Sequence, residues 1–343
     1  MRLLAAIALC VLFTGACDDA ASGSDVSTGA DVAAELDAAA DASPDAGPDA
    51  AADVVAGTDS TAGTDSTATP EIAPVPWGPN NPAQVIGGAR PVTPVLPDAY
   101  DPEVAWPLVI VLHGYTATGG VQDLYFGTSE RGREEGFITL APNGLVDSKG
   151  NRYWNASPAC CDFDLSGVDD VGYILGLIDE AAKLWHIDTD RVYLIGHSNG
   201  GYMAHRLACD APDRITAIAP LAGVSLPTLK DCKAGPPVSV LQMHGTLDAS
   251  VLYAGTVYYP GAAATVALRV AANHCGTTPH IGFARDYDDS VPGAETVPSR
   301  WEGCDGGSTV ELWTMNGTVH LPGFNDTWRD EVLDWLLAQR RAP

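Results

Sequence analysis

Short apolar runs alternate with amphipathic segments through most of the chain after about residue 80. The run LVIVL at residues 108–112 is apolar on both faces, as a central strand of a parallel sheet requires. Similar runs predict strands at residues 136–141, 192–195, 215–221, 238–243 and 310–315. Helical spacing of apolar positions predicts helices at residues 121–135, 168–185, 201–209, 262–272 and 326–341. This alternation predicts an α/β fold, in which helices cover both faces of a mainly parallel sheet and no large insertion forms a lid domain.

The beginning of the chain has the pattern of an export signal. Residues 3–13 form an apolar run that follows Arg2 and is too short to span a bilayer. Small residues precede Cys17, so residues 1–16 resemble a bacterial lipoprotein signal peptide, with Cys17 as the lipidated first residue of the mature chain. The alternative is an ordinary signal cleaved after Ala16, which leaves a free thiol. We expect a secreted or cell-envelope protein, anchored by lipid at a bacterial membrane surface.

Residues 17–79 consist mainly of Ala, Asp, Thr, Ser, Gly and Pro. The segment has few large apolar side chains, and they cannot bury enough surface to offset the conformational entropy lost on ordering. We therefore predict a disordered acidic tether. It contains 13 of the 44 acidic residues and neither Lys nor Arg. The net charge of −26 leaves no basic face for phosphate, which argues against a nucleic-acid partner. Residues 80–343 are then a single globular domain.

The sharpest chemical motif is RVYLIGHSNGGYM at residues 191–203. It places G-x-S-x-G between an apolar strand and a helix, the arrangement of the nucleophile elbow in the α/β-hydrolase fold. Such a turn pushes the Oγ of Ser198 out of the sheet, while Gly196 and Gly200 let neighbouring backbone approach. The positive end of the next helix points to where an oxyanion would form. Ser198 is therefore the predicted nucleophile.

A serine nucleophile needs a base, and the base needs an acid that orients it. In this fold the acid and then the histidine follow the serine along the chain. The segment HGTLD after one predicted strand ends in Asp248, in a loop where catalytic groups converge. Asp305 and Asp326 are the alternative acids. The last predicted strand is followed by a Gly- and Pro-rich loop that contains His320, the predicted base.

Backbone amides complete the expected site. The N–H groups of Asn199, after the nucleophile, and of Tyr115, after a His-Gly pair, are the predicted oxyanion donors. The side chains of Tyr115, Trp154 and Leu321 are candidates for substrate contacts. Ordinary packing at the edge of the sheet is the alternative for Trp154.

Cysteine spacing suggests covalent cross-links. The six cysteines after the tether are Cys160, Cys161, Cys209, Cys232, Cys275 and Cys304. An even number in an exported protein predicts disulfides, although six cysteines allow about 15 pairings. We expect Cys209–Cys232 and Cys275–Cys304, each of which closes a modest loop, and Cys160–Cys161 either as a vicinal pair or as free thiols. No His/Cys spacing indicates a zinc site, and no cofactor is expected.

The acidic loop at residues 162–170 begins like a calcium-binding EF-hand loop. Tyr173, however, stands where such a loop requires a bidentate glutamate. A solvated loop that caps the following helix is the simpler interpretation, and calcium binding is the alternative.

A set of short motifs between residues 106 and 323 points to one enzyme family. The motifs are LHG at 112–114, WNA at 154–156, CC at 160–161, VDDVGY at 168–173, GHSNGGYM at 196–203, RLAC at 206–209, HGTLD at 244–248 and HLPG at 320–323. With them the chain resembles secreted esterases of the polyhydroxybutyrate depolymerase-like and feruloyl esterase-like type, carbohydrate esterase family 1 among them. The resemblance implies an α/β-hydrolase fold, a triad of Ser198, Asp248 and His320, and release of an acid from an ester. Leu321 and Tyr115 depart from the family pattern, which often has Trp and Cys there.

These observations predict a secreted serine carboxylesterase that acts through an acyl-enzyme. The expected substrates are feruloyl or acetyl esters of plant cell-wall polysaccharide, and polyhydroxyalkanoate polyester is the alternative. A second alternative is a surface lipoprotein whose hydrolase domain is catalytically silent and only binds a glycan or polymer. We expect a monomer whose partners are the ester substrate and, through Cys17, a membrane.

Overall fold

The computed structural model describes residues 84–342. The predicted signal peptide at residues 1–16, the predicted lipidation site Cys17 and the predicted tether at residues 17–79 lie outside the described residues. The expectations for them therefore stay predictions. None of the helices between residues 84 and 342 has the length and apolar character needed to cross a membrane.

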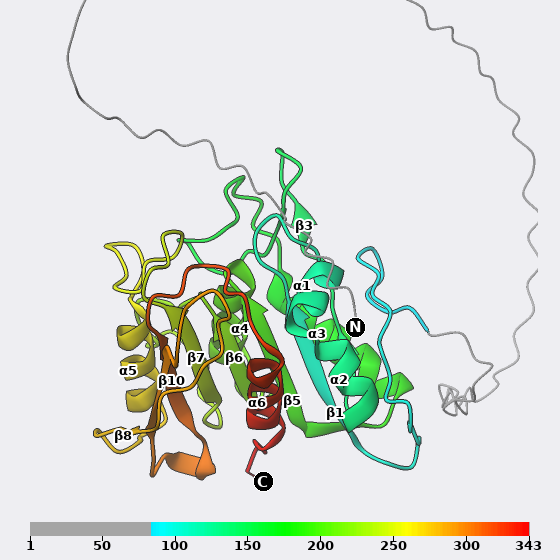
Figure 1. Ribbon diagram of the computed structural model, residues 1–343. Coiled ribbons are helices and arrows are strands. Elements are labelled where there is room, and N and C mark those ends of the chain that lie inside the picture. The colour runs from blue at the N-terminus through cyan, green and yellow to red at the C-terminus, as the bar shows by residue number, and fades with distance from the viewer. Residues whose placement is uncertain (1–83, 343) are drawn as a thin grey trace, which may run out of the picture. The chain divides into compact units, whose positions relative to one another are not determined.

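The centre of the described domain is an eight-stranded sheet with the strand order β2-β1-β5-β6-β7-β10-β9-β8 (Figure 1). The parallel strands are β1 (Trp106–Leu112), β2 (Ile138–Leu140), β5 (Ile187–His197), β6 (Ala217–Leu221), β7 (Ser239–Gly245) and β10 (Val310–Met315). The strands β9 (Thr296–Trp301) and β8 (His280–Ile281) run antiparallel at one edge. A separate hairpin pairs β3 (Leu145–Val146) with β4 (Arg152–Tyr153). The predicted mainly parallel sheet is confirmed, and the antiparallel edge is an addition to it.

Helices pack on both faces of this sheet, as predicted (Figure 1). They are α1 (Gly119–Phe126), α2 (Thr128–Glu135), α3 (Asp170–Leu184), α4 (Asn199–Asp210), α5 (Ala262–Ala272) and α6 (Asp326–Leu337), with a 3-10 turn η1 (Asp305–Gly307) before β10. The single helix expected at residues 121–135 is wrong. Gly127 has a left-handed φ of 69°, a conformation that costs glycine little, and it ends α1 and starts α2.

The strand β1 shows why its sequence is apolar at every position. Leu108, Ile110 and Leu112 pack in a core with residues of α3 and α4. Val109 and Val111 point to the other face and pack in a second core with residues of α1 and α6. All five side chains are fully buried, because a central strand covered on both sides has no solvent face.

The parallel strands bring three distant chain segments to one edge of the sheet. Ser198 directly follows β5, Asp248 lies in the loop after β7, and His320 lies in the loop after β10. Because β5, β6, β7 and β10 are mutually parallel, their carboxyl ends meet at the same edge. The fold therefore places the three candidate catalytic residues at one end of the domain.

Candidate active site

Ser198 lies at the junction of β5 and α4 in a backbone conformation that only a few non-glycine residues adopt. Its φ is 53° and its ψ is −118°, in a region where a side chain is strained. Crowding explains the flanking glycines. A Cβ added to Gly196 would lie 2.4 Å from the carbonyl oxygen of Gly200, and one added to Gly200 would lie 2.0 Å from that of Leu112. The sharp turn that the motif predicted is therefore present in the structure.

The side chain of His320 is hydrogen-bonded to that of Asp248. The Nδ1 atom of His320 lies 2.7 Å from Oδ2 of Asp248, whose side chain is fully buried. The other carboxylate oxygen accepts hydrogen bonds from the backbone N–H groups of Ser250 and Val251, each at 2.8 Å. Both oxygens of Asp248 are thus held by donors, and this fixes the orientation of the His320 ring.

His244 is a further donor to Asp248 that the sequence analysis did not identify as functional. Its Nε2 atom lies 2.7 Å from the carbonyl oxygen of Val251 and 3.3 Å from Oδ2 of Asp248. Burial by itself would raise the pKa of Asp248, but hydrogen bonds from His244 and His320 outweigh burial and hold this pKa well below its usual range. Asp248 is therefore an anion at neutral pH, and it can stabilise a positive charge on His320.

The two alternative acids are engaged elsewhere. The exposed carboxylate of Asp305 is hydrogen-bonded to Nδ1 of His274 at 2.7 Å. Asp326 is the first residue of α6, and its Oδ1 accepts from Arg329 at 2.9 Å. Of the three acids proposed from sequence, Asp248 is the one whose carboxylate reaches His320.

The two predicted oxyanion donors belong to segments next to Ser198. A Cβ added to Gly114 would lie 3.5 Å from Cβ of Ser198, so the loop after β1 runs beside the elbow. Asn199 is the first residue of α4, where backbone N–H groups lack an intrahelical acceptor. Within residues 84–342 the N–H of Tyr115 also has no backbone acceptor. Their catalytic role stays a prediction.

The side chain of Tyr115 turns toward the β3–β4 hairpin. Its hydroxyl donates to Oδ2 of Asp147 at 2.5 Å and accepts from Nδ2 of Asn151 at 3.0 Å. Its ring meets Phe163 edge-on, with the ring centroids 5.4 Å apart. Burial and the bond to Asp147 raise the pKa of Tyr115 to about 12, so its hydroxyl stays protonated. Asp147 and Asn151 were missed because no local pattern links them to a residue 32 and 36 positions away.

The predictions for substrate contacts fare differently from one another. Trp154 is fully buried, which favours the alternative of ordinary packing, and a substrate contact by Trp154 stays a prediction. Its indole Nε1 donates to the carbonyl oxygen of His113 at 3.1 Å, and its ring packs on the His113 ring. Trp154 therefore supports the loop after β1 from inside. Leu321 and Val319 flank His320 with about half of their surface exposed, 52% and 48% respectively, so a substrate contact by Leu321 stays a prediction.

The structure contains three disulfides among the described residues. Cys209–Cys232 and Cys275–Cys304 are paired as predicted, and Cys160–Cys161 is the vicinal pair, one of the two states left open. The vicinal pair lies beside the elbow, since Nδ2 of Asn199 is 3.5 Å from Sγ of Cys160.

The acidic loop uses its carboxylates for its own backbone. Asp162 accepts from the N–H groups of Ser166 and Gly167 at 2.9 and 2.8 Å. Asp164 accepts from the N–H of Ser148 at 2.6 Å. In the part of the chain that the structure describes, no three His, Cys, Asp or Glu side chains are grouped so that they could hold a metal ion.

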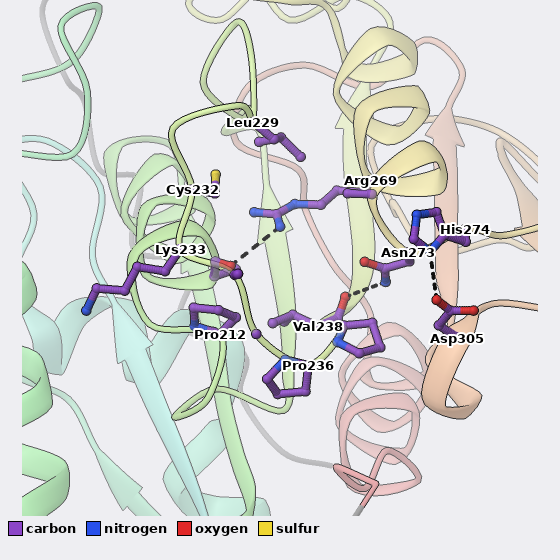
Figure 2. A pocket seen from close by; sticks show the side chains of 15 residues that line it. Pro212, Leu229, Cys232, Lys233, Pro236, Val238, Arg269, Asn273, His274 and Asp305 are labelled. Atoms are coloured by element: carbon purple, nitrogen blue, oxygen red, sulfur yellow. Dashed lines mark hydrogen bonds and ion pairs between the residues drawn. The ribbon is translucent and has the colours of Figure 1, made fainter.

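A cavity of about 250 Å³ lies between the start of β7 and the end of α5 (Figure 2). The side chain of Arg269 lines this cavity and is 4% exposed. Its guanidinium donates to the carbonyl oxygens of His205 and Ala208, at 3.2 and 3.5 Å, in the last turns of α4. The negative end of this helix compensates the buried positive charge. Val238, before β7, lines the cavity, whereas Asp248 follows β7, so the cavity and the candidate triad lie at opposite ends of that strand.

The chain is similar in sequence to known hydrolases. The prolyl oligopeptidase family matches residues 164–235, which contain the elbow. Feruloyl esterase B of Piromyces equi is 27% identical over 68% of this chain and 43% of its own length. The poly(3-hydroxybutyrate) depolymerase of Ralstonia pickettii is 35% identical over 34% of this chain and 25% of its own length. The chain therefore spans less than half the length of these curated relatives.

The fold has a counterpart among solved structures. An acetyl xylan esterase from Aspergillus awamori superimposes with a TM-score of 0.57 and 15% sequence identity. The alignment covers 75% of this chain and 99% of that one. At this identity the likeness concerns the fold, and it extends over the whole of the smaller protein.

Proposed function

We propose that this chain is an esterase of the α/β-hydrolase type and hydrolyses carboxylic esters with Ser198 as the nucleophile. The observation that carries the proposal is the 2.7 Å hydrogen bond between His320 and a buried, ionised Asp248. It joins two loops at the same sheet edge as the strained Ser198. A base held in this way can accept a proton from a serine hydroxyl.

The reaction follows from the roles of these groups. The Oγ of Ser198 attacks the ester carbonyl while Nε2 of His320 takes its proton, and Asp248 stabilises the resulting imidazolium. The backbone amides of Tyr115 and Asn199 donate to the oxyanion of the tetrahedral intermediate. The imidazolium then returns the proton to the leaving alcohol, which leaves an acyl-enzyme. Water, deprotonated by His320, attacks the acyl-enzyme, and the acid and free Ser198 are released.

The direct test uses p-nitrophenyl acetate and the variant Ser198→Ala. We expect a fall in kcat of about 10⁴-fold or more, since the nucleophile of such a triad contributes most of the rate. An intact Ser198→Ala protein that hydrolyses this ester as fast as the parent contradicts the proposal. An active-site serine probe tests the catalytically silent alternative, which requires that the folded parent is not labelled.

A peptidase activity has less support. The match to the prolyl oligopeptidase family covers residues 164–235, which hold α3, β5, α4 and β6 around the elbow. This region is the scaffold of the nucleophile and contains neither Asp248 nor His320. Two of the relatives reported above carry the names of enzymes that act on esters. Hydrolysis of a prolyl p-nitroanilide faster than of p-nitrophenyl acetate would reverse this preference.

The substrate class we favour is a feruloyl or acetyl ester of plant cell-wall polysaccharide. The similarity to feruloyl esterase B covers more than half of the chain and supports this choice. The shorter match to a poly(3-hydroxybutyrate) depolymerase keeps polyester as the second candidate. Turnover of methyl ferulate, acetylated xylan and a hydroxybutyrate oligomer, measured side by side, decides between them.

We further propose export and a lipid anchor at Cys17, which would hold the enzyme as a monomer at a bacterial membrane surface through the tether at residues 17–79. The apolar run at residues 3–13 and the small residues before Cys17 support this. The variant Cys17→Ser should move the protein from the membrane fraction to the soluble fraction. An unchanged membrane fraction contradicts the anchor, and release of the parent itself favours the ordinary signal peptide.

A further inference from the structure

His197, the residue before Ser198 in the elbow, contacts the proposed base directly. Its Nε2 atom lies 2.9 Å from the backbone carbonyl oxygen of His320. The two imidazole rings also pack together, with their centroids 4.8 Å apart. His197 is 8% exposed, and a Cβ added to Gly114 would lie 3.1 Å from its Nδ1. The ring is therefore held on both sides, by the loop of His320 and by the loop after β1.

The hydrogen bond fixes the protonation of His197. A carbonyl oxygen can only accept, so Nε2 must carry the hydrogen. Burial, together with the nearby His320, lowers the pKa of His197 to about 3. The ring is therefore neutral at neutral pH. Its one N–H hydrogen is on Nε2, the nitrogen that faces His320.

We propose that His197 is a positioning residue, which sets the place of His320 relative to Ser198 through this hydrogen bond. His197 is joined to Ser198 by a peptide bond and to His320 by a hydrogen bond, so one rigid ring links the nucleophile to the base. The inference rests on the proposed roles of Ser198 and His320. Proton transfer between the two needs close alignment, and a misplacement of about 1 Å can cost about 100-fold in rate.

Other contacts hold the same loop without touching His320. The hydroxyl of Tyr125 in α1 donates to the carbonyl oxygen of Pro322 at 2.8 Å. The N–H of Gly323 donates to Oδ1 of Asp288 at 2.9 Å. These bonds anchor the loop two and three residues after His320. Loss of the His197 bond should therefore displace the base while the loop stays folded.

Three variants of the full chain separate positioning from packing. His197→Leu fills the space but cannot donate, and His197→Gln offers an amide N–H of similar reach. Tyr125→Phe is the matched control, because it removes one hydrogen bond to the same loop at Pro322. Steady-state kinetics with p-nitrophenyl acetate and thermal unfolding are measured for each. Should His197→Leu fail to fold, His197→Asn replaces it, because the shorter amide does not reach the carbonyl oxygen of His320.

The expected result is a fall in kcat of about 10- to 100-fold for His197→Leu, with KM within about twofold of the parent. His197→Gln should recover most of kcat. Tyr125→Phe should lower the melting temperature but keep kcat close to that of the parent. Parental kcat in a folded His197→Leu protein overturns the positioning role, as does an equal loss of kcat in Tyr125→Phe. If Ser198→Ala leaves the parental rate unchanged, the proposed triad itself fails, which is a separate outcome.

Discussion

The side chain of Asn199 is bonded to both backbone groups of Trp154. Its Oδ1 accepts from the N–H of Trp154 at 2.7 Å, and its Nδ2 donates to the carbonyl oxygen of Trp154 at 3.0 Å. Trp154 in turn donates through its indole to the carbonyl oxygen of His113. The residue after the nucleophile is therefore tied to the loop that carries Tyr115. The two predicted oxyanion donors belong to one hydrogen-bonded unit.

Asn199→Ala should destabilise the domain although it keeps the backbone amide. The change leaves the buried N–H of Trp154 without a partner, which costs about 1–3 kcal/mol. The carbonyl oxygen of Trp154 still accepts from the N–H of Ala156 at 2.9 Å. We expect the free energy of unfolding in urea to fall by about 1–3 kcal/mol. The backbone N–H of Asn199, which is proposed to stabilise the oxyanion, is not removed. The kcat should therefore fall less than it does in Ser198→Ala. Unchanged stability would show that water replaces the lost bonds.

Asp248→Asn should abolish most of the activity without loss of the fold. An amide at this position can present an N–H to Nδ1 of His320, which favours the wrong tautomer of the base, and we expect kcat to fall about 10⁴-fold. Asp305→Asn is the matched control, because Asp305 is exposed and bonded to His274. Its kcat should equal that of the parent. If the two variants lose activity equally, Asp248 is not the acid.

Buried neutral histidines should make the domain sensitive to mild acid. Burial lowers the pKa of His113 to about 4 and those of His197 and His205 to about 3. The unfolded chain takes up these protons near pH 6.5 and the folded chain does not, so stability is present above pH 6.5 and is lost as the pH falls below it. Each histidine should contribute a loss of about 1 kcal/mol between pH 7 and pH 5.5.

Urea unfolding of the parent and of His205→Gln at both pH values checks this expectation. The variant has one fewer titrating group and should lose about 1 kcal/mol less between pH 7 and pH 5.5. His205 bonds to Gln242 and takes no part in the proposed reaction, so activity does not complicate the comparison. A parent whose stability is equal at the two pH values contradicts the low pKa values.

Two glycine-to-alanine changes should have opposite effects. At Gly200 an added Cβ would lie 2.0 Å from the carbonyl oxygen of Leu112, so Gly200→Ala must displace the elbow and should lose both stability and kcat. At Gly176, inside α3, an added Cβ meets nothing within 4 Å, so Gly176→Ala should stabilise the fold by about 1 kcal/mol. Thermal unfolding measures the change in stability, and turnover of p-nitrophenyl acetate measures the change in kcat. Parental behaviour of Gly200→Ala would contradict the tight approach at the elbow.

Local patterns in the sequence were sufficient for most of the fold. Runs that are apolar at every position predicted the parallel strands, and helical spacing of apolar positions predicted most helices. Both patterns arise because the buried face of a strand or helix repeats with the period of the backbone. The strand-turn-helix motif predicted the elbow at Ser198, and HGTLD and the loop after the last parallel strand supplied Asp248 and His320 as candidates. The break at Gly127 and the antiparallel strands β8 and β9 were beyond these patterns.

Tertiary structure alone decided which side chains meet. It placed Asp248, rather than Asp305 or Asp326, against His320. It buried Trp154 inside the domain, and it brought His197 to the carbonyl oxygen of His320 across 123 positions of sequence. The physical reason is that periodicity records which face of an element is buried, whereas a contact between distant residues depends on how whole elements pack. The sequence by itself therefore determined the elements and the candidate residues, and the packing of the sheet decided their partners.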